Sequence, residues 1–343
     1  MQAYSLDKAE TLRAHLAKTH SLLEVRDSDE GSPQWQQITS DDKTPFCGMR
    51  VAQFSPKAFF FAEREQLFTF DGREFVTTLP DSAPQALFAV NACDLTAIAY
   101  QDRFFAKDQH YQRRRSATLL VGIDCLSPCD GGFCPSVDAG PAVREHTADL
   151  ILIPQSKEPD AAWFVAVNNS KGAAALQGLQ LQKAPADWQQ LRNTHEREAI
   201  KAFPDASYIL TGVEHLNAGR ISAEFWETLG VQCLACSGCT SLCPTCSCYT
   251  TYERNTDDDD TVVTERCWDS CLYDGFQREA SGHNPSATPG HRVERFWQHK
   301  FSNDFVAEFG RYGCVGCGRC EQTCPGVIGV HSVMRQISKS CTT

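Results

Sequence analysis

Residues 314–325 read CVGCGRCEQTCP, and residues 233–244 read CLACSGCTSLCP. Both stretches have the spacing C-x2-C-x2-C-x3-C-P, which is typical of chains that bind [4Fe–4S] clusters through cysteine thiolates. Three cysteines two residues apart let a tight loop wrap one corner of a cubane. Small residues between them let backbone N–H groups approach the sulfurs, and the proline turns the chain away. These two motifs determine how the C-terminal part of the chain is interpreted.

The fourth cysteine of each motif is expected to bind the other cluster, as in proteins that carry two such clusters. We therefore predict two [4Fe–4S] clusters in this part of the chain. The predicted ligands are Cys233, Cys236, Cys239 and Cys324 for the first cluster, and Cys314, Cys317, Cys320 and Cys243 for the second. A pair of zinc sites is the alternative, but four-cysteine zinc sites usually pair two short C-x2-C knuckles across a longer spacer.

The composition supports a metal-binding interpretation of the cysteines. The chain has 343 residues, 18 cysteines and a formal net charge of −11. Its start lacks an apolar leader, and no stretch reaches the roughly 18 apolar residues of a membrane span. We therefore expect a cytoplasmic protein, in which cysteines are metal ligands more often than disulfides. The acidic balance argues against nucleic acid as the main partner.

The uneven distribution of cysteines predicts two domains. Residues 135–232 contain no cysteine, and the densest group follows them. We predict an α/β domain over residues 1–217 and a mainly α-helical, ferredoxin-like domain over residues 218–343. Short apolar runs predict strands, and amphipathic stretches predict helices. The expected strands are residues 57–62, 86–92, 118–123, 150–153, 163–167 and 208–211, and the expected helices include residues 95–103, 173–181, 223–229 and 292–309.

A third cysteine group lies in the predicted α/β domain. Cys93 and Cys125 each follow an apolar run, and Cys129 and Cys134 lie in the loop after the second run. If the two strands are parallel neighbours, these cysteines meet at the carboxyl edge of the sheet, where such sheets place their sites. We predict a third [4Fe–4S] cluster held by these four residues. Buried free thiols at strand ends are the alternative.

The remaining cysteines and a charged segment leave alternatives open. A fourth cluster is arithmetically possible on Cys246, Cys248, Cys267 and Cys271. Inert or supporting thiols near the first cluster are favoured, because C-x-C with C-x3-C has no geometric justification as a ligand set. Cys47 and Cys341 are isolated. The charged segment 102–115 is either an electrostatic docking wall beside the third site or a solvated helix face.

Motifs for nucleotides and for nucleophilic catalysis are absent from the sequence. There is no G-x-G-x-x-G after a strand, no G-x4-G-K-[ST] and no G-x-S-x-G elbow. We therefore predict no nucleotide cofactor in this chain. Several clusters without a substrate motif indicate a relay, in which electrons enter from one partner and leave to another.

The sequence resembles one family over nearly its whole length from about residue 56. The resemblance rests on both cluster motifs and on CDLTAI at 93–98, DRFF at 102–105, the segment 121–134, WDSC at 268–271 and HK at 299–300. These residues are similar to the beta subunit of cytosolic NAD(P)-linked nickel–iron hydrogenases (sulfhydrogenases) and to a related iron–sulfur component of anaerobic sulfite reductase. In one place the chain departs from the family. The family loop ends in C-x-C, whereas Gly132 stands at the earlier of these positions here, and Cys129 lies upstream.

The resemblance implies an electron-transfer subunit with [4Fe–4S] clusters. It implies two partners, which are a flavin subunit that handles NAD(P)H and a hydrogenase or sulfur/sulfite-reducing subunit. The alternative function is a redox enzyme with its own substrate-binding cluster in the α/β domain. A redox-sensing regulator is a weaker alternative, since the chain has no recognisable DNA-binding element and is acidic.

Overall fold

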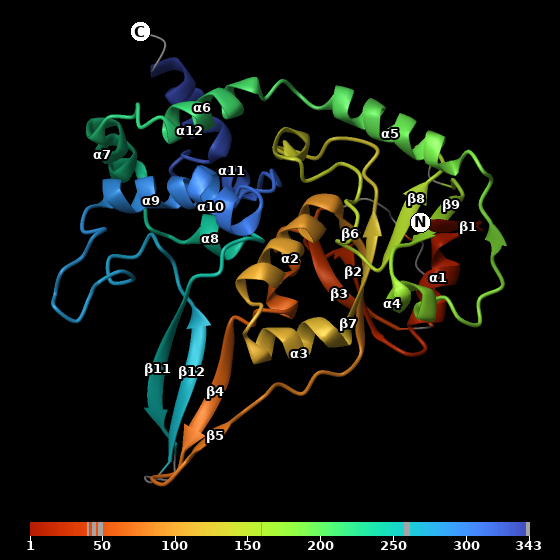
Figure 1. The fold of residues 1–343 in the computed structure, drawn as a ribbon, viewed down its shortest axis with the longest axis horizontal. Helices are drawn as coiled ribbons and strands as arrows, with labels where there is room; N and C mark the ends of the chain where they lie inside the picture. The colour runs from red at the N-terminus through yellow and green to blue at the C-terminus, as the bar shows by residue number, and fades with distance from the viewer. Residues whose placement is uncertain (40, 43–45, 47–50, 159, 257–260, 341–343) are drawn as a thin grey trace.

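The computed structural model describes residues 1–39, 41, 42, 46, 51–158, 160–256 and 261–340 (Figure 1). Within these residues, eight strands form the main sheet: β1 (Gln2–Leu6), β2 (Ser21–Asp27), β3 (Pro33–Ile38), β6 (Gln85–Asn91), β7 (Thr118–Ile123), β8 (Leu150–Pro154), β9 (Trp163–Val167) and β10 (Gln182–Lys183). Their order is β10-β1-β9-β8-β7-β6-β2-β3. The central strands β2, β6, β7 and β8 run parallel, and the outer pairs are antiparallel.

The parallel strands are buried on both faces, which explains their continuous apolar sequence. Along β6, Leu87 and Val90 join one apolar core, whereas Ala86 and Phe88 join the core on the opposite face. The helices that cover the sheet are α1 (Ala9–Leu16), α2 (Ala92–Phe104), α3 (Gln109–Ala117), α4 (Ser170–Ala175) and α5 (Trp188–Ala202). Helix α1 contributes to the second core, and α2 and α3 contribute to the first.

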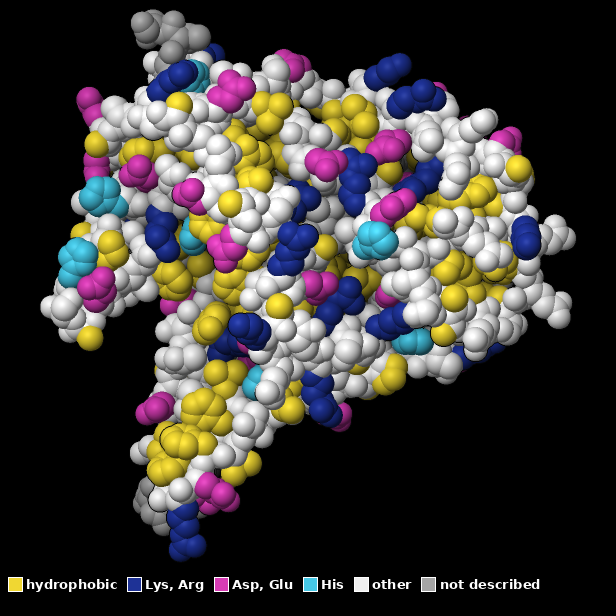
Figure 2. All heavy atoms as spheres, viewed as in Figure 1, with side chains coloured by type: hydrophobic (Ala, Val, Ile, Leu, Met, Phe, Trp, Pro, Cys, Tyr) yellow, Lys and Arg dark blue, Asp and Glu magenta, His cyan; other side chains and the backbone are white. Residues whose placement is uncertain are grey.

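A second sheet extends from the body of the molecule as an arm (Figure 1). In the described residues it contains four antiparallel strands in the order β11-β12-β4-β5: β11 (Tyr249–Asn255), β12 (Val262–Trp268), β4 (Arg64–Phe70) and β5 (Phe75–Thr77). Segments about 200 residues apart therefore pair with each other, as in the register of Cys267 with Arg64. Hydrophobic side chains gather on the arm (Figure 2), where Phe75 is 69% exposed.

The C-terminal half adds a third apolar core between helices. Its helices are α6 (Ser207–Asn217), α7 (Ala223–Gln232), α8 (Gly238–Ser241), α9 (Pro289–Phe301), α10 (Asn303–Phe309), α11 (Arg319–Thr323) and α12 (Val330–Ser340). Helix α6 packs against α12, and α7 packs against α9. The buried residues Ile209, Trp226, Trp297 and Met334 belong to this core. No helix within the described ranges is long and apolar enough to cross a membrane.

The prediction of mixed α/β content is confirmed, and most central strands lie where the sequence placed them. Two predicted strands are wrong. Residues 57–62 begin in a 3-10 turn, η1 (Pro56–Phe59), and residues 208–211 belong to α6. Short apolar runs indicate burial but do not distinguish a strand from a buried helix. The predicted helix 292–309 is divided, because the backbone of Ser302 is extended and its side chain caps α10.

A buried ion-pair network joins the arm to α3. The Arg266 guanidinium lies 2.5 Å from Glu65, also pairs with Asp108, and is only 3% exposed. Arg114 of α3 completes the network at 2.6 Å from Glu65. Because these charges are removed from water, loss of one partner leaves another charge buried and uncompensated.

We therefore expect Arg266→Met to destabilise the protein strongly, by on the order of 3 kcal/mol. Arg64→Met is the matched control, since Arg64 pairs with Glu265 in the same sheet but is 61% exposed. The control should change stability little, because the Arg64 side chain is exposed and Glu265 keeps Arg254 as a partner. Urea midpoints measured anaerobically by circular dichroism compare the two variants. Equal midpoints for both variants would contradict this account of the arm.

Candidate metal centres

Five cysteines from both C-x2-C-x2-C-x3-C-P motifs line one pocket, and all but Cys320 are predicted ligands of the first cluster. Cys233 directly follows α7, Cys239 lies in α8, and Cys324 directly follows α11. Cys236 completes the set and is exposed. The structure thus brings together the four residues predicted to bind the first cluster, including the one contributed by the distant second motif.

The backbone of the first motif is folded to surround this pocket. Ala235 and Ser237 have φ values of 50° and 61°, which curl the loop between the cysteines. The backbone N–H of Ile328 donates to the Cys324 sulfur at 3.5 Å. Burial raises the pKa of Cys239 to about 12, so this thiol needs a metal to bind it as a thiolate.

The other four motif cysteines line an adjacent pocket. Cys314, Cys317 and Cys320 come from the second motif, and Cys243 comes from the first. The backbone N–H of Gly316 donates to the Cys314 sulfur at 3.4 Å. The ammonium group of Lys300 lies 3.3 Å from the Cys243 sulfur, and hydrogen bonds from neighbouring side chains hold the pKa of Cys243 well below its usual range. These contacts favour the thiolate form that a cluster requires.

The third cysteine group meets at the carboxyl edge of the main sheet. Strands β6 and β7 are parallel neighbours with Asn91 opposite Ile123, as the predicted meeting of the cysteines requires. A cavity of about 270 Å³ there is lined by Cys93, Cys125, Cys129 and Cys134. Burial raises the pKa of Cys125 to about 11, although the Asn91 amide donates to its sulfur at 3.4 Å.

Gly132 and Cys129 occupy complementary space in the loop of this third site. A Cβ atom added at Gly132 would overlap the Cys129 sulfur. The Cys129 sulfur therefore occupies the space that the Cβ atom of a cysteine at position 132 would need. This arrangement accounts for the departure from the family's C-x-C ending, because Cys129 can supply a sulfur to the same region.

The second and third sites are in direct contact. The backbone N–H of Phe133, beside Cys134, donates to the Gly316 carbonyl at 2.8 Å. Arg319, between Cys317 and Cys320, forms two buried bonds of 2.6 and 2.8 Å to the Asp94 carboxylate. Asp94 adjoins Cys93, so one ion pair ties the ligand loops of both sites together.

The chemistry of the three donor sets fits [4Fe–4S] clusters. Each pocket is lined by at least four cysteines, whose sulfurs are the usual ligands of such clusters. In the part of the chain that the structure describes, no three His, Cys, Asp or Glu side chains are grouped so that they could hold a single metal ion.

Three of the remaining cysteines, for which the sequence favours inert thiols, gather in another pocket. Cys246, Cys248 and Cys271 line a cavity of about 300 Å³. Cys267 lies apart in β12, opposite Thr250 and Arg64. Their sequence spacing gives no sign of this gathering, because the hairpin of β11 and β12 brings the segments together. Cys47 and Cys341 lie outside the described residues.

The charged segment 102–115 is largely engaged within the molecule. Arg114 pairs with Glu65 at 2.6 Å, and Arg115 pairs with Asp102 at 3.1 Å. Arg103 donates to the backbone carbonyl of Phe309. These intramolecular contacts favour a role in stabilising the fold over a role as an electrostatic docking surface.

Comparison with known proteins agrees with this chemistry. Residues 232–328 match the 4Fe-4S dicluster domain. The match covers both motifs, so the prediction of [4Fe–4S] binding is confirmed, while the number of clusters and their ligands stay predictions. The chain is also 29% identical over 312 residues to sulfhydrogenase 2 subunit beta of Pyrococcus furiosus, covering 89% of this chain and 88% of the relative. This confirms the resemblance to hydrogenase beta subunits. No solved structure matches the chain significantly.

The Asp94–Arg319 pair supplies a first test of the site. Arg319→Met should leave the Asp94 carboxylate buried without a partner, at a cost of about 3–5 kcal/mol. The double variant Asp94→Leu/Arg319→Met should recover most of that loss, because no charge is then stranded. Urea midpoints of the holo-proteins measure both effects. A double variant no more stable than Arg319→Met would contradict the assignment.

Close backbone contact at Gly316 supplies a second test. Gly316 has a φ of 65°, and an added Cβ would lie 2.6 Å from the backbone nitrogen of Cys134. Gly316→Ala should therefore push the second and third sites apart and lower the iron content. Gly282→Ala is the matched control, because Gly282 has a φ of 86° but nothing within 4 Å of its Cβ position. Equal iron contents in Gly316→Ala and Gly282→Ala would show that the close contact at Gly316 is not needed for cluster binding.

Proposed function

We propose that this chain is an iron–sulfur electron-transfer subunit of a multi-subunit oxidoreductase. It would relay single electrons between two partners, which are a hydrogenase or sulfur/sulfite-reducing subunit and a flavin/NAD(P)H-binding subunit. The observation that carries this proposal is the set of three pockets that between them are lined by twelve cysteines. Similarity to a relative named sulfhydrogenase 2 subunit beta supports it.

The ligand assignment in this proposal follows the three pockets. Cys233, Cys236, Cys239 and Cys324 hold the first [4Fe–4S] cluster, Cys314, Cys317, Cys320 and Cys243 hold the second, and Cys93, Cys125, Cys129 and Cys134 hold the third. Such clusters supply one-electron redox chemistry at potentials set by hydrogen bonds, charge and solvent exposure. No nucleotide cofactor is assigned to this chain.

The protein's own groups would bind and tune the clusters. Backbone N–H groups of Gly316 and Ile328 point at ligand sulfurs, which stabilises negative charge on them. Lys300 and Arg319 place positive charge beside the second site. Buried aromatic side chains, such as Phe296 and Trp297, line the pockets and exclude water.

The first site contains an exposed cysteine and is proposed as the point of exchange with a partner subunit. Cys236 is exposed, and Val231, Leu234 and Val327 are 86%, 68% and 68% exposed. Apolar side chains around an exposed ligand suit a contact that excludes water during electron transfer. The third site would then lie at the other end of the relay.

The finer organisation belongs to the same proposal. The chain would comprise an α/β domain over residues 1–217 and a mainly helical, ferredoxin-like domain over residues 218–343, with a cytoplasmic location. The hairpin of β11 and β12 is an inserted arm in this scheme, since it pairs with β4 of the first domain.

A redox enzyme is the second candidate function. The cavity of about 270 Å³ at the third site favours it, because Ser127, Asp130 and Gln322 line the cavity beside the cysteines. In this case the isolated holo-chain would turn over a substrate with a reduced dye as electron donor. A chain without such turnover that still exchanges electrons with a flavin subunit supports the relay.

The third site gives the sharpest test of the ligand assignment. Cys129→Ala should remove about four irons from about twelve per chain. Cys129→Ala/Gly132→Cys should restore them, because the new side chain starts beside the vacated sulfur position. Cys267→Ser is the control and should keep all the iron, since Cys267 lies in none of the three cysteine pockets. Iron analysis after anaerobic purification measures each variant. Full iron in Cys129→Ala would refute Cys129 as a ligand.

A further inference from the structure

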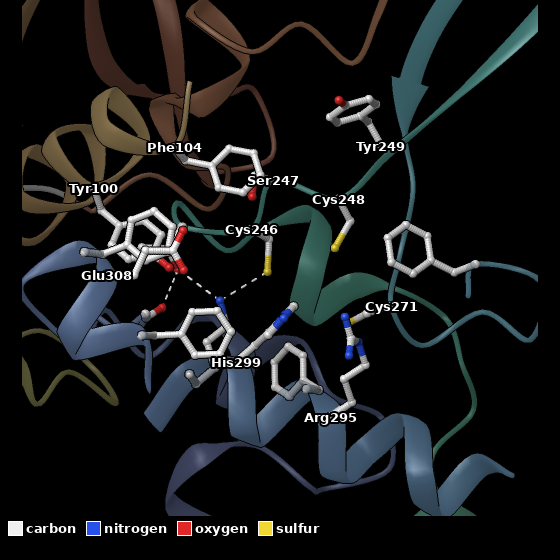
Figure 3. Close-up of a pocket in the computed structure, with 17 residues that line it drawn as sticks. Tyr100, Phe104, Cys246, Ser247, Cys248, Tyr249, Cys271, Arg295, His299 and Glu308 are labelled. Carbon is white, nitrogen blue, oxygen red and sulfur yellow. Dashed lines mark hydrogen bonds between the residues drawn. The ribbon is translucent and has the colours of Figure 1, made fainter. Parts of the chain in front are cut away.

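The pocket that contains Cys246, Cys248 and Cys271 lies outside the three proposed cluster sites. It has a volume of about 300 Å³, and Lys300, His299 and Tyr100 are among its lining residues. Figure 3 shows the sulfurs of Cys246 and Cys248 directed into it. Aromatic side chains at the rim of the pocket reach solvent. Phe104 is 45% exposed, and Tyr249 is 41% exposed. The pocket therefore brings three cysteine side chains to one cavity whose rim reaches solvent.

Two of these cysteines come from neighbouring segments of the chain. Cys248 and Cys271 line the same pocket and belong to one packed cluster of side chains. The backbone N–H of Asp269 donates to the Cys248 carbonyl at 3.0 Å, which fixes the two segments side by side. The interaction between the two side chains lowers the pKa of Cys248 to about 7 and raises that of Cys271. A thiolate beside a thiol is the arrangement of redox-active cysteine pairs.

A fourth cluster fits this pocket less well than a cysteine pair. The pocket is lined by three cysteines, and the other candidate, Cys267, lies in β12 opposite Thr250. The ammonium of Lys300 lies 3.2 Å from the Cys246 sulfur.

The cysteine pair adjoins the first cluster site. Thr240 follows Cys239, a proposed ligand, and Ser270 precedes Cys271. The Thr240 hydroxyl donates to the Ser270 hydroxyl at 3.1 Å. One hydrogen bond therefore connects the ligand loop to the loop of the pair, which gives electrons a short route between them.

We propose that Cys248 and Cys271 form a redox-active pair that cycles between dithiol and disulfide and exchanges electrons with the chain's iron–sulfur clusters. This inference rests on the proposed function. In the oxidative direction one S–S bond forms, and the protons that the two sulfurs still carry leave to solvent as two electrons are given up. The two electrons pass to two oxidised clusters, one electron each, and the reverse step returns them. The pair thus converts single electrons into an electron pair.

Differential alkylation of the full-length holo-protein tests whether the pair forms. The protein is equilibrated anaerobically with dithiothreitol at graded oxidised-to-reduced ratios and quenched in acid. Free thiols are blocked with light N-ethylmaleimide, disulfides are then reduced, and the released thiols take the heavy reagent. Peptide mass spectrometry should show Cys248 and Cys271 gaining heavy label together, with one midpoint. Light label on both residues at every ratio would overturn the proposal.

A reductive titration tests whether the pair exchanges electrons with the clusters. After oxidation, the wild-type chain should take up about two more electrons from dithionite than Cys271→Ser, because the disulfide is a two-electron couple. Cys267→Ser is the matched control and should equal the wild type. Equal uptake by Cys271→Ser and wild type would overturn the electron exchange.

Iron content separates this inference from the proposed function. Cys248→Ser and Cys271→Ser should keep the wild-type iron, whereas a loss of about four irons would identify a fourth cluster and overturn the pair. If the wild-type protein binds its clusters but does not form the disulfide, the proposed cysteine pair is wrong and the proposed relay is unaffected. Wild-type protein that binds no clusters overturns the relay and, with it, the electron exchange.

Discussion

The buried ion pair between Asp94 and Arg319 is the constraint on which the arrangement of the sites depends. Both side chains are almost fully buried, at 1% and 2% exposure, and the guanidinium grips the carboxylate through two hydrogen bonds. Burying two charges costs several kcal/mol, so the pair is stable only when its geometry is satisfied. Arg319 lies within the second cluster motif, and Asp94 starts α2 beside Cys93. The α/β part and the cluster-binding part are therefore held in one relative position.

Near this ion pair, the backbone of the second cluster motif lies closer to the loop of the third site than a residue with a Cβ atom would allow. Gly316 and Gly318 have φ values of 65° and 78°, and a Cβ at either would meet the loop of the third site within 2.6 Å. The glycines that let N–H groups reach the sulfurs thus also bring two sites together. Close contact suits one-electron transfer, because its rate falls steeply with distance.

Much of the candidate site was predictable from the sequence because ligand spacing is a local property. The two motifs predict their own grouping, and the apolar strands β6 and β7 predict that Cys93 and Cys125 meet at one sheet edge. The Asp94–Arg319 pair was not predictable, since its members are 225 residues apart. The hairpin of β11 and β12 was also missed. Strand β11 is mostly exposed and polar, so it lacks the alternation that marks a half-buried strand. The proximity of Cys248 and Cys271 depends on that hairpin, so it could not be predicted either.

We propose that three [4Fe–4S] sites lie in contact within this one chain. Electron paramagnetic resonance of the fully reduced holo-protein tests it most directly, because neighbouring paramagnetic clusters broaden and split each other's signals. The account predicts an interaction spectrum that simplifies when the third site is emptied by Cys125→Ser. A sum of independent, unbroadened cluster signals that Cys125→Ser leaves unchanged would contradict it.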